Sequence, residues 1–202
     1  MDLALAQSPS NPDIQLQADH IGASLYDQEG NHEKAFERLT AVMHKHHRRL
    51  TTQPDLRFAY EDIQVRRGLD AVWIGQFQEA VPLLKECLSF ALKAEDRGNV
   101  LSSLGRCYSE LGEYDSAREN FIQALRIGLT KELEGEAHMR LAVACAKLGL
   151  FNEAKQEFQL CEERVADYGL EIVKIYGWLS WVSNRLGEKA ESEKYKRLAH
   201  PS

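Results

Sequence analysis

The sequence predicts an all-α fold in which about five antiparallel helical hairpins stack into a right-handed solenoid. Three observations support this prediction. Glycines recur at steps of 45, 37, 37 and 38 residues, and such a period is typical of stacked repeats. A small residue lies seven positions before each glycine and another lies five positions after it. Strong helix formers dominate between the glycines, and strand-like alternation is absent. The five glycines are Gly30, Gly75, Gly112, Gly149 and Gly187.

Each repeat is predicted to be two helices joined at its glycine. In the third repeat Val100, Leu104 and Tyr108 recur at four-residue steps and give one apolar face. Gly112 then suits the left-handed conformation that ends a helix, and the second helix is expected from 113 to 127. The small residues before and after the glycine are expected to meet where the two helices cross.

These repeats are expected to form a single domain over residues 12–200, preceded by a disordered N-terminal arm at residues 1–11. Asn11 would cap the first helix and Pro12 would open it. The longer first step predicts an extended helix followed by a loop near 51–54. The repeats are expected at about 16–50, 55–94, 98–131, 135–168 and 171–200.

The pattern around Gly112 resembles a tetratricopeptide repeat, which has a small residue, an aromatic, a glycine turn, an alanine and a second aromatic in this order. The residues that carry the resemblance are Leu104, Gly105, Tyr108, Leu111, Gly112, Tyr114, Ala117, Phe121, Ala124 and Leu125. The likeness covers about residues 14–200 and is weaker in the end repeats. Repeat five has Lys189 and Lys196 at its aromatic positions, so it is expected to be a solubilising cap with Tyr195 and Leu198 packed. The steps of about 37 residues exceed the family's 34, and we expect the extra residues in the second helix or its exit loop.

The resemblance implies a non-catalytic scaffold or adaptor that binds a protein or peptide in a concave groove lined by the first helices. The groove positions carried over from the family include Arg106, Lys174, Asn184 and Arg185 as polar anchors. The residues with which some members clamp chaperone tails are missing at the matching positions. The full set of predicted groove residues is Leu69, Trp73, Asn99, Ser102, Arg106, Met139, Val143, Lys174, Trp181, Asn184 and Arg185.

Two alternatives remain open for the function. The chain could be a regulatory domain that senses a signalling peptide and acts through a partner protein. It could also be a structural homo-oligomer in which weakly capped end repeats of different copies stack.

Composition argues against several other functions. A net charge of −6 disfavours non-specific nucleic-acid binding. The N-terminus lacks the basic start of a signal peptide, and no apolar run approaches the roughly 20 residues that span a bilayer. The four cysteines form no C-x-x-C pair, which predicts buried thiols in a reducing, cytoplasmic environment. No phosphate loop, catalytic triad or zinc motif is present, so we expect no enzymatic activity, cofactor or metal.

The densest polar cluster lies at residues 44–49, with the sequence His-Lys-His-His-Arg-Arg. His44 and His47 share one helix face, which leaves a metal or anion site as an alternative. No carboxylate or cysteine stands at ligand spacing beside them, so a solvated helix end is favoured. Contact with an acidic partner is the functional alternative.

Overall fold

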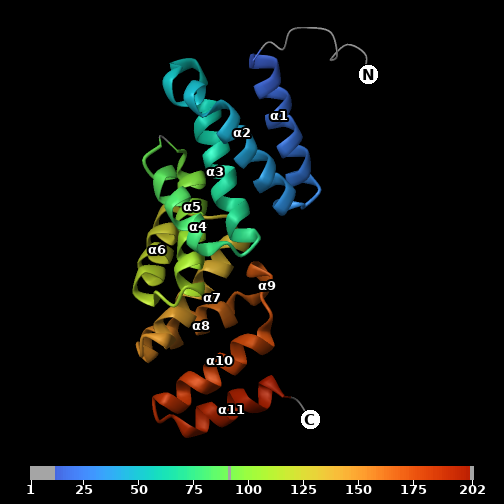
Figure 1. Cartoon of the computed structure of the whole chain (residues 1–202). Coiled ribbons are helices and arrows are strands. Elements are labelled where there is room, and N and C mark those ends of the chain that lie inside the picture. Colours follow the sequence, from blue (N-terminus) through green and yellow to red (C-terminus); the bar gives the residue numbers. More distant parts are fainter. Residues whose placement is uncertain (1–11, 91, 201–202) are drawn as a thin grey trace. The chain divides into compact units, whose positions relative to one another are not determined.

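The computed structural model describes residues 12–90 and 92–200, and every regular element in these ranges is helical (Figure 1). The predicted all-α fold is therefore confirmed. The expected N-terminal arm at residues 1–11 lies outside the described residues. In order, the elements are α1 (Pro12–Gln28), α2 (His32–Thr52), the 3₁₀ turn η1 (Pro54–Leu56), α3 (Arg57–Trp73), α4 (Phe77–Cys87), α5 (Ala94–Glu110), α6 (Tyr114–Ile127), α7 (Lys131–Lys147), α8 (Phe151–Glu163), α9 (Val165–Tyr168), α10 (Ile172–Arg185) and α11 (Lys189–Ala199).

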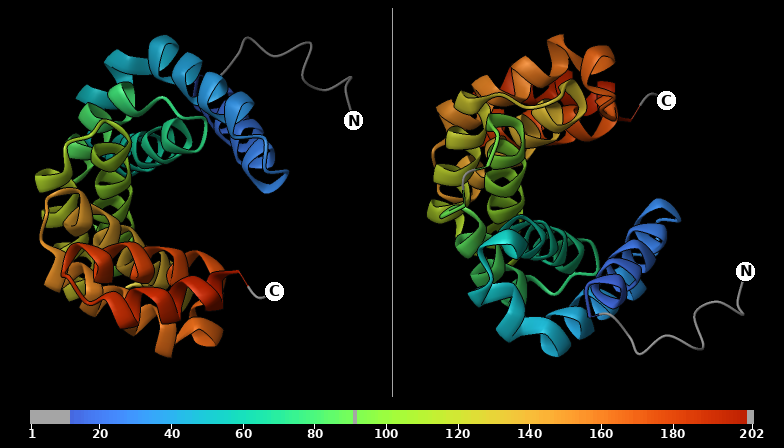
Figure 2. Two further views of the ribbon diagram at one scale, coloured as in Figure 1. Left: turned by 90° about the horizontal axis from the view of Figure 1, so that it is seen from below. Right: turned by 90° about the horizontal axis from the view of Figure 1, so that it is seen from above.

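The described helices form two compact bodies, an N-terminal body within residues 12–90 and a C-terminal body within residues 92–200. In the N-terminal body α1 pairs with α2 and α3 pairs with α4. In the C-terminal body the hairpins are α5–α6, α7–α8 and α10–α11, and the short α9 lies between the last two (Figures 1 and 2). The prediction that residues 12–200 form one continuous repeat domain stays a prediction.

All five repeat glycines end a helix in the same way. Their φ angles lie between 70° and 81°, the left-handed region that favours glycine. The amide after each glycine donates a hydrogen bond to the carbonyl five residues earlier, at 2.8–2.9 Å, which is the bond of a Schellman cap. The predicted helix–glycine–helix unit is thereby confirmed in every repeat.

The small residue before each glycine allows the two helices of a hairpin to approach closely. A Cβ on Gly105 would lie 2.8 Å from the ring of Phe121, and one on Gly68 would lie 2.7 Å from the side chain of Leu84. In repeat five Ser180 and Ser192 meet directly, because each hydroxyl donates to the other's carbonyl, at 3.0 and 2.9 Å. The predicted helix crossing is therefore confirmed there. In repeats two and three the small residue instead lies closest to the residue nine positions after the glycine, which is Leu84 or Phe121.

The extra length of repeats three and four extends their first helices. α5 and α7 begin at Ala94 and Lys131, four residues before the expected starts, and each has 17 residues. The expectation that the second helix or its exit loop takes up the length is therefore wrong for these first helices. It holds for the step from Gly149 to Gly187, where the exit segment after α8 contains α9 and α10 has only 14 residues. Gly98 in the first turns of α5 lets the segment after α6 approach, since a Cβ there would lie 2.8 Å from the carbonyl oxygen of Gly128.

The N-terminal body combines an apolar core with polar contacts between helices. Leu16, Leu39, Leu50 and Ile63 are among the buried core residues. α2 runs 21 residues to Thr52, so the predicted extended helix is confirmed. Of the loop expected near 51–54, only Gln53 lies outside a helical turn, because η1 begins at Pro54.

Polar side chains attach α1 to its neighbours. His20 Nε2 lies 2.7 Å from Asp62 of α3, and Arg66 donates to Ser24 at 3.0 Å. Although burial opposes it, the bond from His20 and the charge of Arg66 hold the pKa of Asp62 below its ordinary value. Asp19 is buried on α1 and accepts a bond from Arg38 at 3.0 Å. α1 is thus held by charged hydrogen bonds as well as by apolar contacts.

The last hairpin only partly follows its prediction as a cap. Tyr195 is buried as expected, and its hydroxyl donates to Glu162 at 3.0 Å. Burial and this acidic neighbour raise the pKa of Tyr195 to about 12. Leu198 is 41% exposed, so the expectation that it packs is wrong. Lys189 and Lys196 are exposed, as a polar cap requires.

Candidate peptide-binding surface

The predicted groove residues of the C-terminal body lie on α5, α7 and α10, the first helices of its three hairpins. On α5, Asn99, Ser102 and Arg106 are half-buried. The carboxamide oxygen of Asn99 and Nε of Arg106 are fully buried. These two side chains therefore offer only part of their polar atoms to a ligand.

Met139 of α7 and Lys174 of α10 line a cleft of about 260 Å³, and the half-buried Val143 lies one helical turn after Met139. The cleft carries both signs of charge. Lys174 donates to Glu171 at 2.8 Å, and Arg140 donates to Glu136 at 2.7 Å. The structure therefore brings Met139 and Lys174 together and adds neighbours that the sequence analysis missed, namely Arg140, Leu170 and Glu171.

Leu170 and Glu171 reach this cleft because α9 fixes the segment before them. Tyr168 of α9 covers Gly135, where a Cβ would lie 2.4 Å from the tyrosine Cβ. The tyrosine ring stacks on His138, and its hydroxyl donates to Glu134 at 3.2 Å. The only sequence signal for this arrangement is Gly169, which ends α9 with a φ of 61°.

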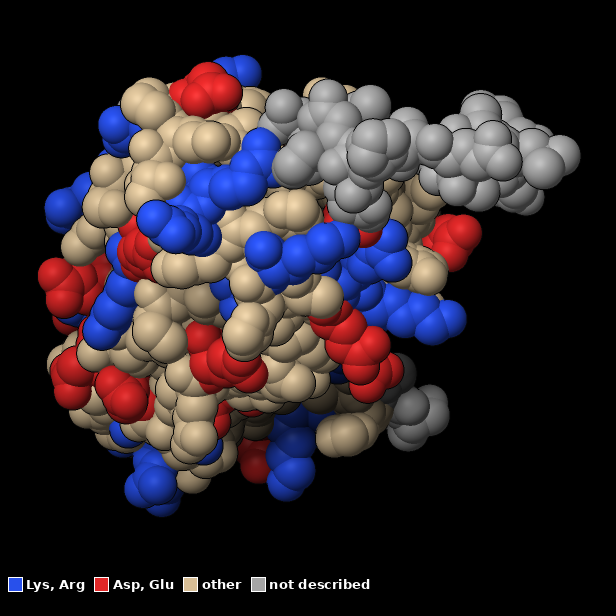
Figure 3. Space-filling model, turned by 45° about the horizontal axis from the view of Figure 1, so that its top comes forward, with Lys and Arg blue, Asp and Glu red and all other residues tan. Residues whose placement is uncertain are grey.

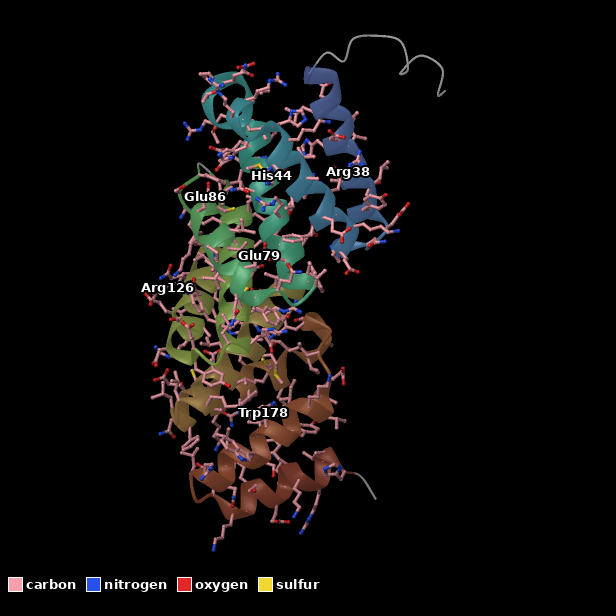
Figure 4. All side chains as sticks on the ribbon, in the orientation of Figure 1. Arg38, His44, Glu79, Glu86, Arg126 and Trp178 are labelled. Atoms are coloured by element: carbon pink, nitrogen blue, oxygen red, sulfur yellow. The ribbon has the colours of Figure 1, made fainter. Side chains whose placement is uncertain are left out.

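Trp181 lies at the exposed edge of an aromatic cluster. Trp178, labelled in Figure 4, lies on α10. Its ring stacks on Phe158 of α8, with centroids 5.6 Å apart, and contacts Trp181 edge-on. Trp181 also contacts Phe151 edge-on and remains 39% exposed. The guanidinium of Arg185 lies 5.1 Å from the centre of its ring, within cation–π range. The cluster presents Trp181 in a fixed orientation.

Trp181 and Asn184 line a second cleft, of about 400 Å³, between α10 and α11. Its wall includes Ser180, Lys196 and His200. Four of the predicted residues on α7 and α10 therefore divide between two clefts of the C-terminal body, whereas Val143 and Arg185 line neither.

In the N-terminal body Leu69 is half-buried and Trp73 is 60% exposed. Trp73 stacks on the ring of His32, with a centroid distance of 5.3 Å and an interplanar angle of 11°. His32 in turn bonds Asp70 at 2.9 Å. Trp73 therefore packs on the His32 ring of α2 and keeps much of its surface exposed. Its membership of a groove shared with the C-terminal body stays a prediction.

The cluster at residues 44–49 is only partly solvated. His46 is buried, with Nε2 3.7 Å from the carboxylate of Asp19, and Lys45 donates to the same carboxylate at 3.1 Å. The expectation of a wholly solvated helix end is wrong for His46, because α1 covers this side of α2, whereas Lys45 is exposed and pairs with Asp19 at the edge of the contact. His44 and His47 are exposed. No group of three metal-ligating side chains occurs in the described part of the chain.

A further cleft, of about 540 Å³, opens in the N-terminal body where α2, η1 and α3 meet. Leu50, Pro54, Arg57, Tyr60 and Phe90 contribute to its wall. The sequence analysis placed a loop there but did not identify a cleft, since Phe90 reaches it from the far end of the next hairpin.

Lys and Arg side chains are interspersed with Asp and Glu on the face shown in Figure 3. Among the described helices none is both long and apolar enough to cross a membrane.

The four cysteines are buried free thiols, as predicted. Burial raises the pKa of Cys87 and Cys161 to about 12 and that of Cys107 to about 11, and it also raises the pKa of Cys145. Since the thiolate is the nucleophile, these side chains are poor candidates for catalysis.

We therefore expect iodoacetamide to label the folded protein slowly at pH 8 and the urea-unfolded protein rapidly.

The raised pKa of the buried thiols also predicts a pH dependence of stability. Folding favours the neutral thiol, so its contribution is complete below the unfolded pKa of roughly 8.5 and is lost as pH rises towards the folded value. The urea midpoint should fall above pH 9, and the fall should be smaller in a Cys87→Ala, Cys161→Ala variant. Rapid labelling of the folded chain would contradict the assignment.

Comparison with family models identifies two tetratricopeptide-repeat matches, at residues 60–129 and 135–164. The chain belongs to the tetratricopeptide-repeat family. The predicted resemblance is confirmed, and the family generally mediates protein–protein interactions. No curated protein matches the chain.

Solved structures show the same fold at low sequence identity. A mutant of MamA superposes with a TM-score of 0.71 at 21% identity, covering 94% of this chain and 98% of that one. A putative kinesin light chain of Podosopora anserina with nearly identical TPR-like repeats superposes with a TM-score of 0.65 at 22% identity, covering 92% of each chain. These likenesses establish the tetratricopeptide-repeat fold.

Proposed function

We propose that this tetratricopeptide-repeat protein is a non-catalytic scaffold or adaptor that binds a protein or peptide on the first helices of its repeats. The observation that carries the proposal is the pairing of Trp181 with Arg185 at the edge of a rigid aromatic cluster. Tryptophan and arginine are the residues most enriched at binding hot spots. Fixing them before binding lowers the entropy lost when a ligand orders them.

The neighbouring clefts indicate which ligand would suit this surface. Trp181 offers an apolar face, and Lys174 and Arg185 offer exposed positive charge. A segment with an apolar residue flanked by carboxylates would complement both. We further propose a cytoplasmic location, which the four unpaired thiols support.

The proposal is tested by isolating a partner on the purified chain and measuring its affinity for variants. Trp181→Ala together with Arg185→Glu should weaken binding by about 30-fold or more, the scale of a hot-spot loss. Arg126→Glu makes the same charge change on the second helix α6 and should leave the affinity unchanged (Figure 4). Circular dichroism of both variants checks the fold. Equal binding by the two variants would place the site elsewhere.

A further inference from the structure

Ion pairs join the second helices of successive repeats in the C-terminal body. Arg118 of α6 pairs with Glu153 of α8 at 2.6 Å, and Lys155 of α8 pairs with Glu191 of α11 at 2.5 Å. Both pairs occupy the same register. The basic residue lies six positions after its glycine, and the acidic residue lies four positions after the next glycine. This register therefore identifies which positions face each other when one repeat stacks on another.

An apolar contact accompanies the ion pair. Trp178, nine positions before its glycine, stacks on Phe158 of the preceding repeat. Val182, five positions before the same glycine, is fully buried, as is Ala144 at the equivalent position of repeat four. These two positions on a first helix thus form the face that packs on the preceding repeat.

Repeat one exposes apolar residues at these same two positions. Ile21 lies nine residues before Gly30 and is 61% exposed, and Leu25 lies five before it and is 54% exposed. Lys34, four positions after Gly30, is also exposed. We call Ile21, Leu25 and Lys34 the N-terminal end face.

Repeat five exposes the opposite side of the same contact. Glu193 lies six positions after Gly187, where Arg118 and Lys155 stand in their repeats, and Lys196 stands at the position of Phe158. Both are exposed and form an ion pair with each other at 3.8 Å, which docking would exchange for a pair with Lys34. With the buried Ala199 they line the cleft of about 400 Å³. We call Glu193, Lys196 and Ala199 the C-terminal end face.

The two end faces carry opposite charges at the ion-pair positions, but the acid and the base have exchanged places relative to the internal ion pairs. Inside the C-terminal body the earlier repeat supplies the base and the later repeat the acid. Here Glu193 is the acid on the earlier repeat and Lys34 the base on the later one. Lys34 can therefore form an ion pair with repeat five, which has Glu193 at this position. It would be repelled by a repeat with a base there, as repeats three and four have in Arg118 and Lys155.

We propose that a second copy of this chain docks head to tail, with the N-terminal end face of one copy on the C-terminal end face of the other. Lys34 then pairs with Glu193, and Ile21 and Leu25 are covered mainly against the aliphatic stem of the exposed Lys196. Such an interface is heterologous, because two different patches meet. Trp181 lines the same cleft as Glu193 and Lys196, so a docked copy would compete with a ligand on Trp181. Self-association is a second role that goes beyond the proposed function.

Sedimentation velocity of the full chain over low to high micromolar concentrations tests this proposal. The wild-type protein should associate reversibly. Glu193→Lys and Lys34→Glu should each raise the dissociation constant by about fivefold or more, since each replaces an attraction by a repulsion. Ile21→Asp should weaken association further by exposing a carboxylate to the apolar contact. Glu163→Lys, the same change at an exposed position of α8, is the matched control and should have no effect.

Mixing the variants distinguishes head-to-tail docking from any other association. Glu193→Lys and Lys34→Glu proteins should associate when mixed although neither self-associates strongly alone, because one interface between them carries the pair with reversed charges and the other carries the wild-type pair. The double variant should associate like the wild type. A wild-type chain that stays monomeric throughout would overturn the proposal. Association that neither single variant weakens, or that neither mixing nor the double variant restores, would overturn it as well.

Discussion

Replacing Phe158 with alanine should destabilise the C-terminal body by about 3–5 kcal/mol, the usual cost of deleting a fully buried aromatic side chain. Phe158 of α8 is 0% exposed, and its ring stacks on Trp178 of α10. The substitution removes a large apolar volume at the contact between two repeats. Because each repeat packs mainly on its neighbours, the loss should also weaken the attachment of the last hairpin.

Urea unfolding followed by tryptophan fluorescence measures this effect, since Trp178 and Trp181 both report on the C-terminal body. Phe58→Ala is the matched control, because Phe58 is 79% exposed and its removal should change stability by less than about 0.5 kcal/mol. Equal midpoints for the two variants would show that α8 and α10 do not pack through Phe158.

Replacing Gly135 with alanine should cost about 1–3 kcal/mol, the range for overpacking a close contact. The added Cβ would lie 2.4 Å from Cβ of Tyr168 and 3.2 Å from its Cα. Backbone atoms do not yield as a flexible side chain does, so α9 must move away from α7. We expect the cleft around Met139 and Lys174 to change with it, because Leu170 and Glu171 follow directly on α9.

Gly177→Ala is the matched control and should have the opposite sign. Gly177 also lies inside a first helix, but nothing approaches within 4 Å of its added Cβ. Alanine there should stabilise the protein by about 0.5–1 kcal/mol, because glycine loses more backbone entropy in a helix. Thermal unfolding of both variants gives the comparison. Stabilisation by both would show that Tyr168 does not lie over Gly135.

The site was less predictable from the sequence than the fold. The position of Trp181 on a first helix followed from the register around Gly187, and the structure places it on α10. Its aromatic neighbours come from α8, and only the packing of one hairpin on the next identifies them. Leu170 and Glu171 were missed because they gain their position from Tyr168, which contacts a glycine 33 residues earlier in the chain.

The sequence by itself determined that the chain folds into helical hairpins, because helix propensity, apolar spacing and the glycine that ends each first helix are local properties. It also determined which residues occupy equivalent positions in successive repeats. Only the tertiary structure decided which of these residues are covered. Trp178 is half-buried and Ile21 is exposed at the same repeat position, because α8 packs against the first and no described helix packs against the second. Exposure depends on the neighbouring repeat, and that contact joins residues far apart in the chain.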